Sequence, residues 1–269
     1  MVNDQMVHGL IFAAGLGTRL RPLTDTMPKA LVPLAGKPLL QWQVEKLRDA
    51  GITDIIVNVH HFPDMIIDAV RANDGWGCNI TISDERDGLL DTGGGLKKIK
   101  SEIINHKSEI INAPILACNV DILSNIDIHA LIAEYERTGV SQLVVSERQT
   151  QRYLLFDEEG LLRGWTNIAT GEVRPTNLQS SISNFQKLAF SGMQILSPGV
   201  LSCLSQMPQD KFSLIDFYMS VCEKQIINHK SEIINLKAYI PEAFKMMDVG
   251  KIDQIDEAES FAENLFCKK

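Results

Sequence analysis

The stretch GLIFAAGLGTRLRP at residues 9–22 decides the fold class that we expect for this chain. Its first part, Gly9 to Ala14, is an apolar run without alternation, which is typical of a strand buried on both faces of a parallel sheet. Two glycines and two arginines follow it. Small side chains let a ligand approach the backbone, and exposed N–H groups can hold phosphate oxygens. The stretch predicts an α/β fold with a phosphate-binding loop after its first strand.

Working outward from this loop, apolar strands alternate with helical patterns through the first half of the chain. Such alternation implies right-handed crossovers and a mostly parallel sheet. We predict a Rossmann-like three-layer αβα sandwich whose mixed sheet is mostly parallel. The predicted strands are 54–59, 79–83 and 114–118, and the predicted helices are 38–50, 64–73 and a helix after residue 95.

The second half is less regular, but it contains no Pro-, Gly- or Ser-rich linker. We therefore expect a single domain over 1–269, with an N-terminal nucleotide half at about 1–125 and a C-terminal acceptor half at about 126–269. The predicted strands of the second half are 141–146, 153–156, 161–165 and 190–196, and its helices are 212–222 and 251–266.

Composition excludes several classes of protein. The chain has 34 acidic and 26 basic residues and a formal charge of −8, which argues against a nucleic-acid or anionic-membrane surface. Its apolar runs are too short to span a membrane, and its N-terminus lacks the pattern of a secretory signal. Five cysteines without a CxxC pair favour free thiols in a reducing compartment. We expect a cytoplasmic protein, either a monomer or a small homo-oligomer.

The glycine-rich loop also carries positive charge, because Arg19 and Lys29 follow its glycines. Guanidinium and ammonium groups there suit a polyphosphate. The loop lacks the third glycine of the dinucleotide fingerprint and the Gly-Lys-Ser/Thr of a P-loop. It therefore predicts a nucleotide site of a different kind.

Two further groups of residues suggest a ligand. The segment ERDGLLDTGGG at 85–95 places three glycines at a strand-to-helix junction, which leaves room for a flat base or a ribose, or simply caps a flexible loop. Asp121 and Asp248 each follow a predicted strand, where they can cap a helix or form a turn, or hold Mg²⁺ together with phosphate oxygens.

Residues 14–38 resemble the signature of the sugar-1-phosphate nucleotidyltransferases. The resemblance implies that Gly15 to Thr18 wrap the triphosphate of an NTP and that Arg19 activates the leaving pyrophosphate. It also implies that Lys29 bridges the α-phosphate and the sugar 1-phosphate, and that Asp121 and Asp248 bind Mg²⁺. Arg19, Lys29, Asp121 and Asp248 are thus the expected catalytic residues. The expected nucleotide contacts are Ala13, Ala14, Gly15, Gly17, Thr18, Arg19, Glu85, Thr92, Gly93 and Gly94.

The chain departs from the pattern of that family in three places. Val120 stands where a glycine usually precedes the first aspartate, and Met247 and Lys251 replace the usual neighbours of the second. Where many relatives carry Glu-Lys-Pro, this chain has Trp165-Thr166-Asn167. The residues expected to contact the sugar are Tyr153, Trp165, Asn167, Ser191 and Gly192.

A short chain with Thr-Gly-Gly-Gly is most similar to N-acetylmuramate 1-phosphate uridylyltransferases and small mannose-1-phosphate guanylyltransferases. The expected reaction is UTP plus N-acetylmuramate 1-phosphate, giving a nucleotide sugar of the kind used for cell walls, and pyrophosphate. A mannose-1-phosphate guanylyltransferase, a phosphocholine cytidylyltransferase and a non-catalytic NTP sensor remain alternatives.

Two features of the sequence belong to none of these candidate sites. His60 and His61 lack a third metal ligand in sequence, so we expect them to serve a loop rather than zinc. The segment IINHKSEIIN occurs at 103–112 and again at 226–235, where it either extends two surface connections or makes a contact between the copies or with another subunit.

Overall fold

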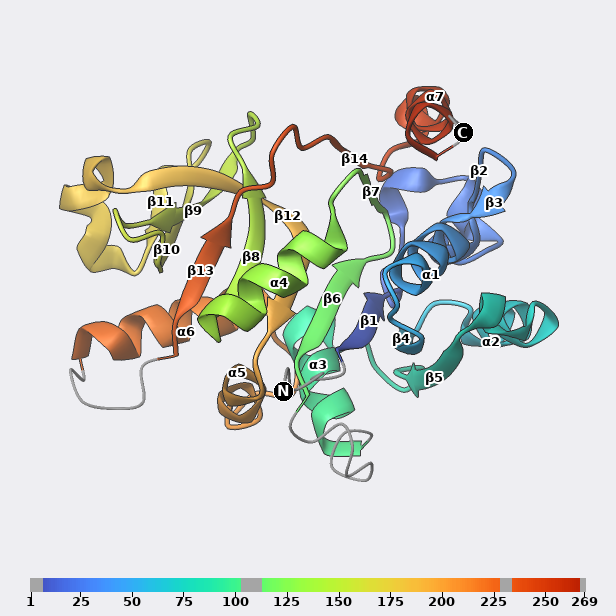
Figure 1. Ribbon diagram of the computed structural model, residues 1–269, viewed down its shortest axis with the longest axis horizontal. Coiled ribbons are helices and arrows are strands. Elements are labelled where there is room, and N and C mark those ends of the chain that lie inside the picture. Colours follow the sequence, from blue (N-terminus) through green and yellow to red (C-terminus); the bar gives the residue numbers. More distant parts are fainter. Residues whose placement is uncertain (1–6, 103–112, 228–233, 267–269) are drawn as a thin grey trace.

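The computed structural model describes residues 7–102, 113–227 and 234–266. In these ranges one central sheet is covered by helices on both faces (Figure 1). The first copy of IINHKSEIIN lies outside the described residues, and so does most of the second.

The central sheet is mixed, and its strands lie in the order β11-β10-β9-β12-β6-β1-β4-β5, with β8 pairing with β12 and with β13. The pairs β6-β1-β4-β5 are parallel, as the alternation predicts, and β12 joins the second half antiparallel to β6. The α/β expectation is confirmed, with the parallel part concentrated in the first half. The strands are β1 (His8–Phe12), β4 (Asp54–Val59), β5 (Asn79–Asp84), β6 (Ile115–Asn119), β8 (Ser141–Ser146), β9 (Arg152–Phe156), β10 (Leu162–Asn167), β11 (Glu172–Arg174), β12 (Gln186–Leu196) and β13 (Leu236–Tyr239).

Side chains of the central strands alternate between two separate apolar cores. Ile11 and Cys118 face one core, whereas Leu10 and Ala117 face the other. This alternation follows from the period of two of a strand, and it explains why the buried strands carry uninterrupted apolar runs. Helices α1 (Leu39–Asp49), α2 (Pro63–Ala72), α4 (Ile128–Thr138) and α7 (Ile255–Phe266) cover the first face; α3 (Asp91–Glu102), α5 (Pro198–Leu204) and α6 (Leu214–Ile227) cover the second.

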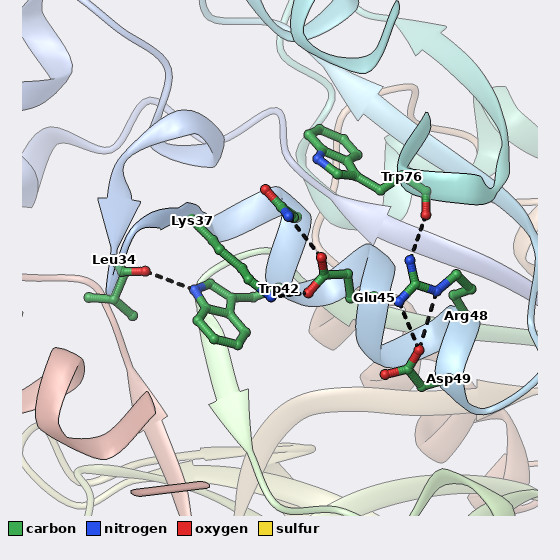
Figure 2. Close-up of polar contacts among 8 residues, drawn as sticks. Leu34, Lys37, Trp42, Glu45, Arg48, Asp49 and Trp76 are labelled. Carbon is green, nitrogen blue, oxygen red and sulfur yellow. Dashed lines mark hydrogen bonds and ion pairs between the residues drawn. The ribbon is translucent and has the colours of Figure 1, made fainter. Parts of the chain in front are cut away.

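Helix α1 holds the end of the signature segment in place (Figure 2). The Trp42 indole N–H donates to the carbonyl of Leu34 at 3.0 Å, and the Lys37 ammonium pairs with Glu45 at 2.6 Å. Lys37 also lies over the Trp42 ring, 4.6 Å from its centroid. The two short strands β2 (Pro33–Leu34) and β3 (Lys37–Pro38) are thus fixed on α1, so Lys37 packs on this helix.

Two short strands that the sequence did not predict bring distant segments together. β7 (Ile122–Ser124) pairs antiparallel with β14 (Met246–Asp248), and Asp248 lies opposite Ile122. The pair lies at the end of the sheet where β6 finishes (Figure 1). No helix of the described residues is long and apolar enough to cross a membrane.

Candidate active site

A cavity of about 270 Å³ opens at the carboxyl ends of β1 and β6. This edge is where ligands bind in open α/β sheets. Its lining combines the signature loop with the ends of both strands and with residues from distant segments. The lining residues are Phe12, Ala13, Gly15, Gly17, Thr18, Arg19, Lys29, Thr92, Asn119, Val120, Asp121 and Gly250.

The two glycines of the signature loop serve different purposes. Gly17 has a positive φ of 65°, and a Cβ added there would lie 2.8 Å from Thr24 Cγ2 and 3.0 Å from Lys29 Cβ. The Thr24 hydroxyl also donates to the carbonyl of Gly17 at 2.8 Å. A Cβ added at Gly15 would meet nothing within 4 Å. Gly17 is therefore required by the loop itself, whereas Gly15 leaves open space beside the cavity.

Lys29 and Asp121 form an ion pair at the cavity wall. Lys29 is nearly buried, with 8% of its surface exposed, and the short 3₁₀ turn Lys29–Leu31 presents it. Asp121 lies two residues after the end of β6. The structure thus joins two residues that lie 92 positions apart and that the sequence assigned separately.

Asp248 reaches the same edge through the pairing of β14 with β7. The backbone N–H of Val249 donates to the carbonyl of Asp121 at 2.8 Å, and Arg19 Nη2 lies 3.8 Å from Asp248 Oδ2. Burial raises the pKa of Asp248, and the nearby Asp121 carboxylate adds to that rise. Arg19, Lys29 and Asp121 therefore line the cavity, and Asp248, which is not part of the lining, lies beside it against Arg19.

Gly250 is a member of this site that the sequence analysis missed. It lines the cavity, and a Cβ added there would lie 2.5 Å from Asp248 Oδ1 and 2.7 Å from Arg19 Nη2. The segment Met-Asp-Val-Gly gave a signal for it, but only the aspartate was chosen. Asn119 was also missed, although it ends β6 two residues before Asp121.

Helix α1 clamps the strand that carries this arrangement. Gln43 Nε2 donates to the carbonyl of Ile122 at 2.6 Å, and the Lys46 ammonium donates to Ser124 Oγ at 2.6 Å. Burial lowers the pKa of Lys46 to about 8. These contacts hold β7 and therefore β14, the strand that ends at Asp248.

The two aspartates suit a divalent cation. Mg²⁺ in proteins takes one or two carboxylates and completes its octahedron with water and phosphate oxygens. Asp121 and Asp248 lie close enough to repel each other, since Asp121 raises the pKa of Asp248, and a cation between them would relieve that repulsion. The described residues contain no group of three His, Cys, Asp or Glu side chains that would form a complete protein cage.

Glu85 lies behind the signature loop, not in the cavity lining. It is 1% exposed and accepts a hydrogen bond of 2.8 Å from Asn58 Nδ2, while Asn58 Oδ1 accepts one of 2.8 Å from the backbone N–H of Ala13. Burial raises the pKa of Glu85. Glu85 thus orients Asn58, and Asn58 holds the loop, while a direct contact between Glu85 and a nucleotide stays a prediction.

The glycines after Thr92 are explained by packing. A Cβ at Gly93 would lie 2.5 Å from the Phe212 ring, and one at Gly94 would lie 2.1 Å from the carbonyl oxygen of Asp210. The N–H groups of both glycines donate to the carbonyl of Phe212, at 2.9 and 3.1 Å. The glycines thus allow a close approach of α3 to the segment before α6, and only Thr92 of the three lines the cavity; the base contacts of Gly93 and Gly94 stay a prediction.

Four of the five residues expected to contact a sugar are used by the fold itself. Tyr153 is 9% exposed, and its Oη accepts the N–H of Thr150 at 3.0 Å. The Ser191 hydroxyl is buried and donates to the carbonyl of Val144 at 2.8 Å. The structure shows Trp165 packed against the core beneath α6, and Asn167 accepting from Ala169 N in a turn.

Gly192 is the exception among these five. It has a positive φ of 74°, and a Cβ added there would lie 2.8 Å from Nδ2 of Asn119, which lines the cavity.

His60 and His61 have the loop role that we expected. His60 Nδ1 hydrogen-bonds to the carbonyl of Glu85 at 2.7 Å, and His61 Nε2 to the carbonyl of Thr24 at 3.2 Å.

Comparison with known proteins shows the family of this chain. A model of the family described as nucleotidyl transferase matches residues 8–264, nearly the whole chain. The chain belongs to this family. It is 30% identical over 223 residues to the N-acetylmuramate alpha-1-phosphate uridylyltransferase of Caulobacter vibrioides, covering 78% of this chain and 81% of that protein.

Two further relatives show a similar likeness over different lengths. The chain is 40% identical over 124 residues to the corresponding uridylyltransferase of Neisseria meningitidis, which covers 46% of this chain and 51% of that one. It is 29% identical over 248 residues to the mannose-1-phosphate guanyltransferase of Kluyveromyces lactis, which covers 91% of this chain and 62% of the relative.

Solved structures share the fold over almost the whole chain. A putative glucose-1-phosphate thymidylyltransferase from Bacillus anthracis superposes with a TM-score of 0.74 at 15% identity, covering 96% of both chains. A UDP-glucose pyrophosphorylase complexed with UDP-glucose superposes with a TM-score of 0.70 at 20% identity, covering 96% of this chain and 99% of that one. This nucleotidyltransferase therefore has the expected α/β architecture.

Proposed function

We propose that this nucleotidyltransferase transfers a uridylyl group from UTP to N-acetylmuramate 1-phosphate and releases pyrophosphate. The observation that carries the proposal is the cavity at the sheet edge, which Arg19, Lys29 and Asp121 line together and beside which Asp248 lies 3.8 Å from Arg19. The choice of substrates is supported by the 30% identity to the uridylyltransferase of Caulobacter vibrioides over most of both chains.

In this proposal the backbone of the signature loop holds the triphosphate. Gly15 leaves space for it, and the guanidinium of Arg19 supplies charge-assisted hydrogen bonds to the phosphates that become pyrophosphate. Lys29, at the cavity wall, stabilises the negative charge that develops on the α-phosphate. Mg²⁺, held by Asp121 and Asp248, would offset charge on the phosphate oxygens.

The reaction itself needs position and charge rather than a covalent intermediate. An oxygen of the sugar phosphate bonds to the α-phosphorus while the bond from that phosphorus to the β-bridging oxygen breaks, and pyrophosphate leaves with the electron pair. Cys118 is the cysteine closest in sequence to Asp121, but burial raises the pKa of its thiol to about 12. A thiolate nucleophile is thus disfavoured there at neutral pH.

We divide the roles between the two halves of the chain. Residues from about 1 to 125 supply the loop, Lys29 and Asp121, and so bind the donor. Residues from about 126 to 269 supply Asp248, and their Gly192 lies against Asn119 of the cavity lining, so we assign the acceptor to this half.

A mannose-1-phosphate guanyltransferase is the second candidate, because the relative from Kluyveromyces lactis matches 91% of this chain.

The test is pyrophosphate release with Mg²⁺, crossing the four NTPs against a panel of acceptors. The panel holds the 1-phosphates of N-acetylmuramate, mannose, glucose and N-acetylglucosamine, together with phosphocholine. Fast release with UTP and N-acetylmuramate 1-phosphate is the expected result. Preference for GTP with mannose 1-phosphate would establish the second candidate, and CTP with phosphocholine would replace both. No release from any pair, with NTP still bound, would contradict the enzymatic proposal and favour a sensor.

A further inference from the structure

A second cavity, of about 400 Å³, lies between α3 and the connection from α5 to α6 (Figure 1). We call it the α3 cavity. Its volume falls in the range of small-molecule sites, roughly 300–1,000 Å³. It is distinct from the active-site cavity, because the lining residues of the two differ throughout. The lining residues of the α3 cavity are Leu90, Gly94, Lys97, Lys98, Lys100, Ser101, Ser205 and Asp210.

The lining of the α3 cavity is positively charged. Three of its residues are lysines and one is an aspartate, whereas the whole chain has a formal charge of −8. A cleft lined mainly by one sign of charge raises the local concentration of ions of the opposite sign. The lining therefore favours an anionic ligand.

Two of the three lysines hold the walls of the cavity. Lys97 Nζ donates to two backbone carbonyls of the α5–α6 connection, at 3.0 Å each, and to Asp210 Oδ1 at 2.8 Å. These three bonds use all the N–H groups of its ammonium. Lys98 Nζ donates to the carbonyl of Asp84, at the end of β5. Both lysines thus contribute their charge from fixed positions.

Lys100 differs from the other two, because the fold gives its charge no partner. It is 7% exposed, and its ammonium makes no hydrogen bond or ion pair with residues 7–102, 113–227 and 234–266. A charged group that is buried without a partner is costly, and burial lowers the pKa of Lys100. An anion in the α3 cavity would supply the missing partner.

We propose that the α3 cavity binds a small phosphate ester and that Lys100 receives its phosphate. The phosphate group presents several acceptor oxygens and a negative charge to the ammonium. The rest of the cavity leaves room for an organic group beside Leu90 and the hydroxyls of Ser101 and Ser205. Binding there does not depend on the reaction assigned to the active site.

Four variants separate this site from the active site and from the general charge of the chain. Lys100→Met replaces the unpaired ammonium with an apolar side chain of similar length, so the protein should keep or gain stability. Ser101→Asp adds a carboxylate to the lining. Lys187→Met removes a lysine from an exposed position of β12, and Arg19→Gln removes a cation from the active-site cavity. Thermal melting checks that all four variants fold.

Binding is measured calorimetrically with glycerol 3-phosphate in a chloride buffer of constant ionic strength. We expect Lys100→Met to weaken binding roughly tenfold or more, the usual effect of losing a charged hydrogen-bond donor. Ser101→Asp should also weaken binding, because the added carboxylate repels phosphate and competes for Lys100. Lys187→Met and Arg19→Gln should retain the binding that Lys100→Met loses.

Inorganic phosphate is the second probe, and it should bind more weakly than the ester because it leaves part of the cavity unfilled. Equal affinity for the two probes would assign the site to free phosphate and overturn the ester. Equal binding of glycerol 3-phosphate to Lys100→Met and wild type would overturn the site itself, as would no binding to the wild type. Loss of binding in Arg19→Gln alone would place the anion in the active-site cavity and likewise overturn the proposal.

Discussion

The two sides of the active-site cavity differ in how their residues are used. On the donor side, Arg19, Lys29 and Asp121 line the cavity, as their positions in the sequence predict. On the acceptor side, the Tyr153 hydroxyl accepts from the backbone of Thr150 in the loop before β9, and the Ser191 hydroxyl donates to the backbone of Val144 in β8. The donor side is thus made of charged residues at strand ends, whereas polar residues within acceptor-side strands stabilise the fold.

This difference has a physical cause. A charged side chain is costly to bury without a partner, so one that follows a buried strand in a glycine-rich loop is kept there for a ligand or an ion pair. A tyrosine or serine within a strand finds a hydrogen-bond partner in almost any sheet. Its identity therefore says little about a ligand.

The largest effect should come from Asp121→Asn. The variant removes the charge that faces Lys29 and one of the two proposed metal ligands, so we expect turnover to fall on the order of a thousandfold. The fold should persist, because the hydrogen bond from Val249 goes to the backbone carbonyl of Asp121. Pyrophosphate release measures the fall in turnover, and thermal melting checks that the fold persists. Turnover near the wild-type value would remove Asp121 from the mechanism and end the contrast between the two sides.

The next largest effect tests the glycines, with Gly94→Ala against Gly15→Ala. A Cβ at Gly94 lies 2.1 Å from the backbone oxygen of Asp210, so the segment before α6 must move. We expect the free energy of unfolding to fall by about 3 kcal/mol, despite the better helix propensity of alanine. Urea denaturation measures this change.

Gly15→Ala is the matched variant, since its Cβ meets no atom within 4 Å. It should keep the stability of the wild type and raise the KM for the NTP, because the methyl group enters the space left for phosphate. If Gly94→Ala instead kept full stability and altered the preference for a base, the glycines would be base contacts, as the sequence first indicated.

Glu85→Gln should have a smaller effect that depends on pH. Burial raises the pKa of Glu85 in the folded protein above its value in the unfolded chain. The ionised carboxylate therefore costs stability above the folded-state pKa, and this cost disappears as the pH falls through that pKa towards the unfolded value. The wild type should gain stability relative to the variant over this range, on the order of 1 kcal/mol.

Urea denaturation of wild type and Glu85→Gln at pH 7.5 and at pH 5 measures that gain. Glu136→Gln, on the exposed face of α4, is the control and should follow the wild type at both values. A constant difference between Glu85→Gln and wild type would show that burial does not control the ionisation of Glu85. The variant would also test whether Asn58 needs this carboxylate to hold the N–H of Ala13.

Much of the fold could be predicted because apolar runs and glycine-rich turns act locally. The strand at 54–59 and the helix near 64–73 were found with nearly the observed bounds. β7 and β14 were not, since each has three residues and forms only through pairing across more than 120 positions. The packing of Gly94 could not be predicted for a related reason: its neighbour, Asp210, lies far away in the sequence.

Tyr153→Phe should have the smallest effect, and it sharpens the comparison between the two sides. The change removes the Oη that accepts the N–H of Thr150, and it keeps a ring that is 9% exposed. We expect the free energy of unfolding to fall by about 1 kcal/mol, because one hydrogen bond is lost at a partly solvated site. The KM for the acceptor should stay within about twofold. The opposite pattern, with unchanged stability and a raised acceptor KM, would place Tyr153 on the sugar. The acceptor side would then use strand residues for its ligand, and the physical distinction between the two sides would not hold.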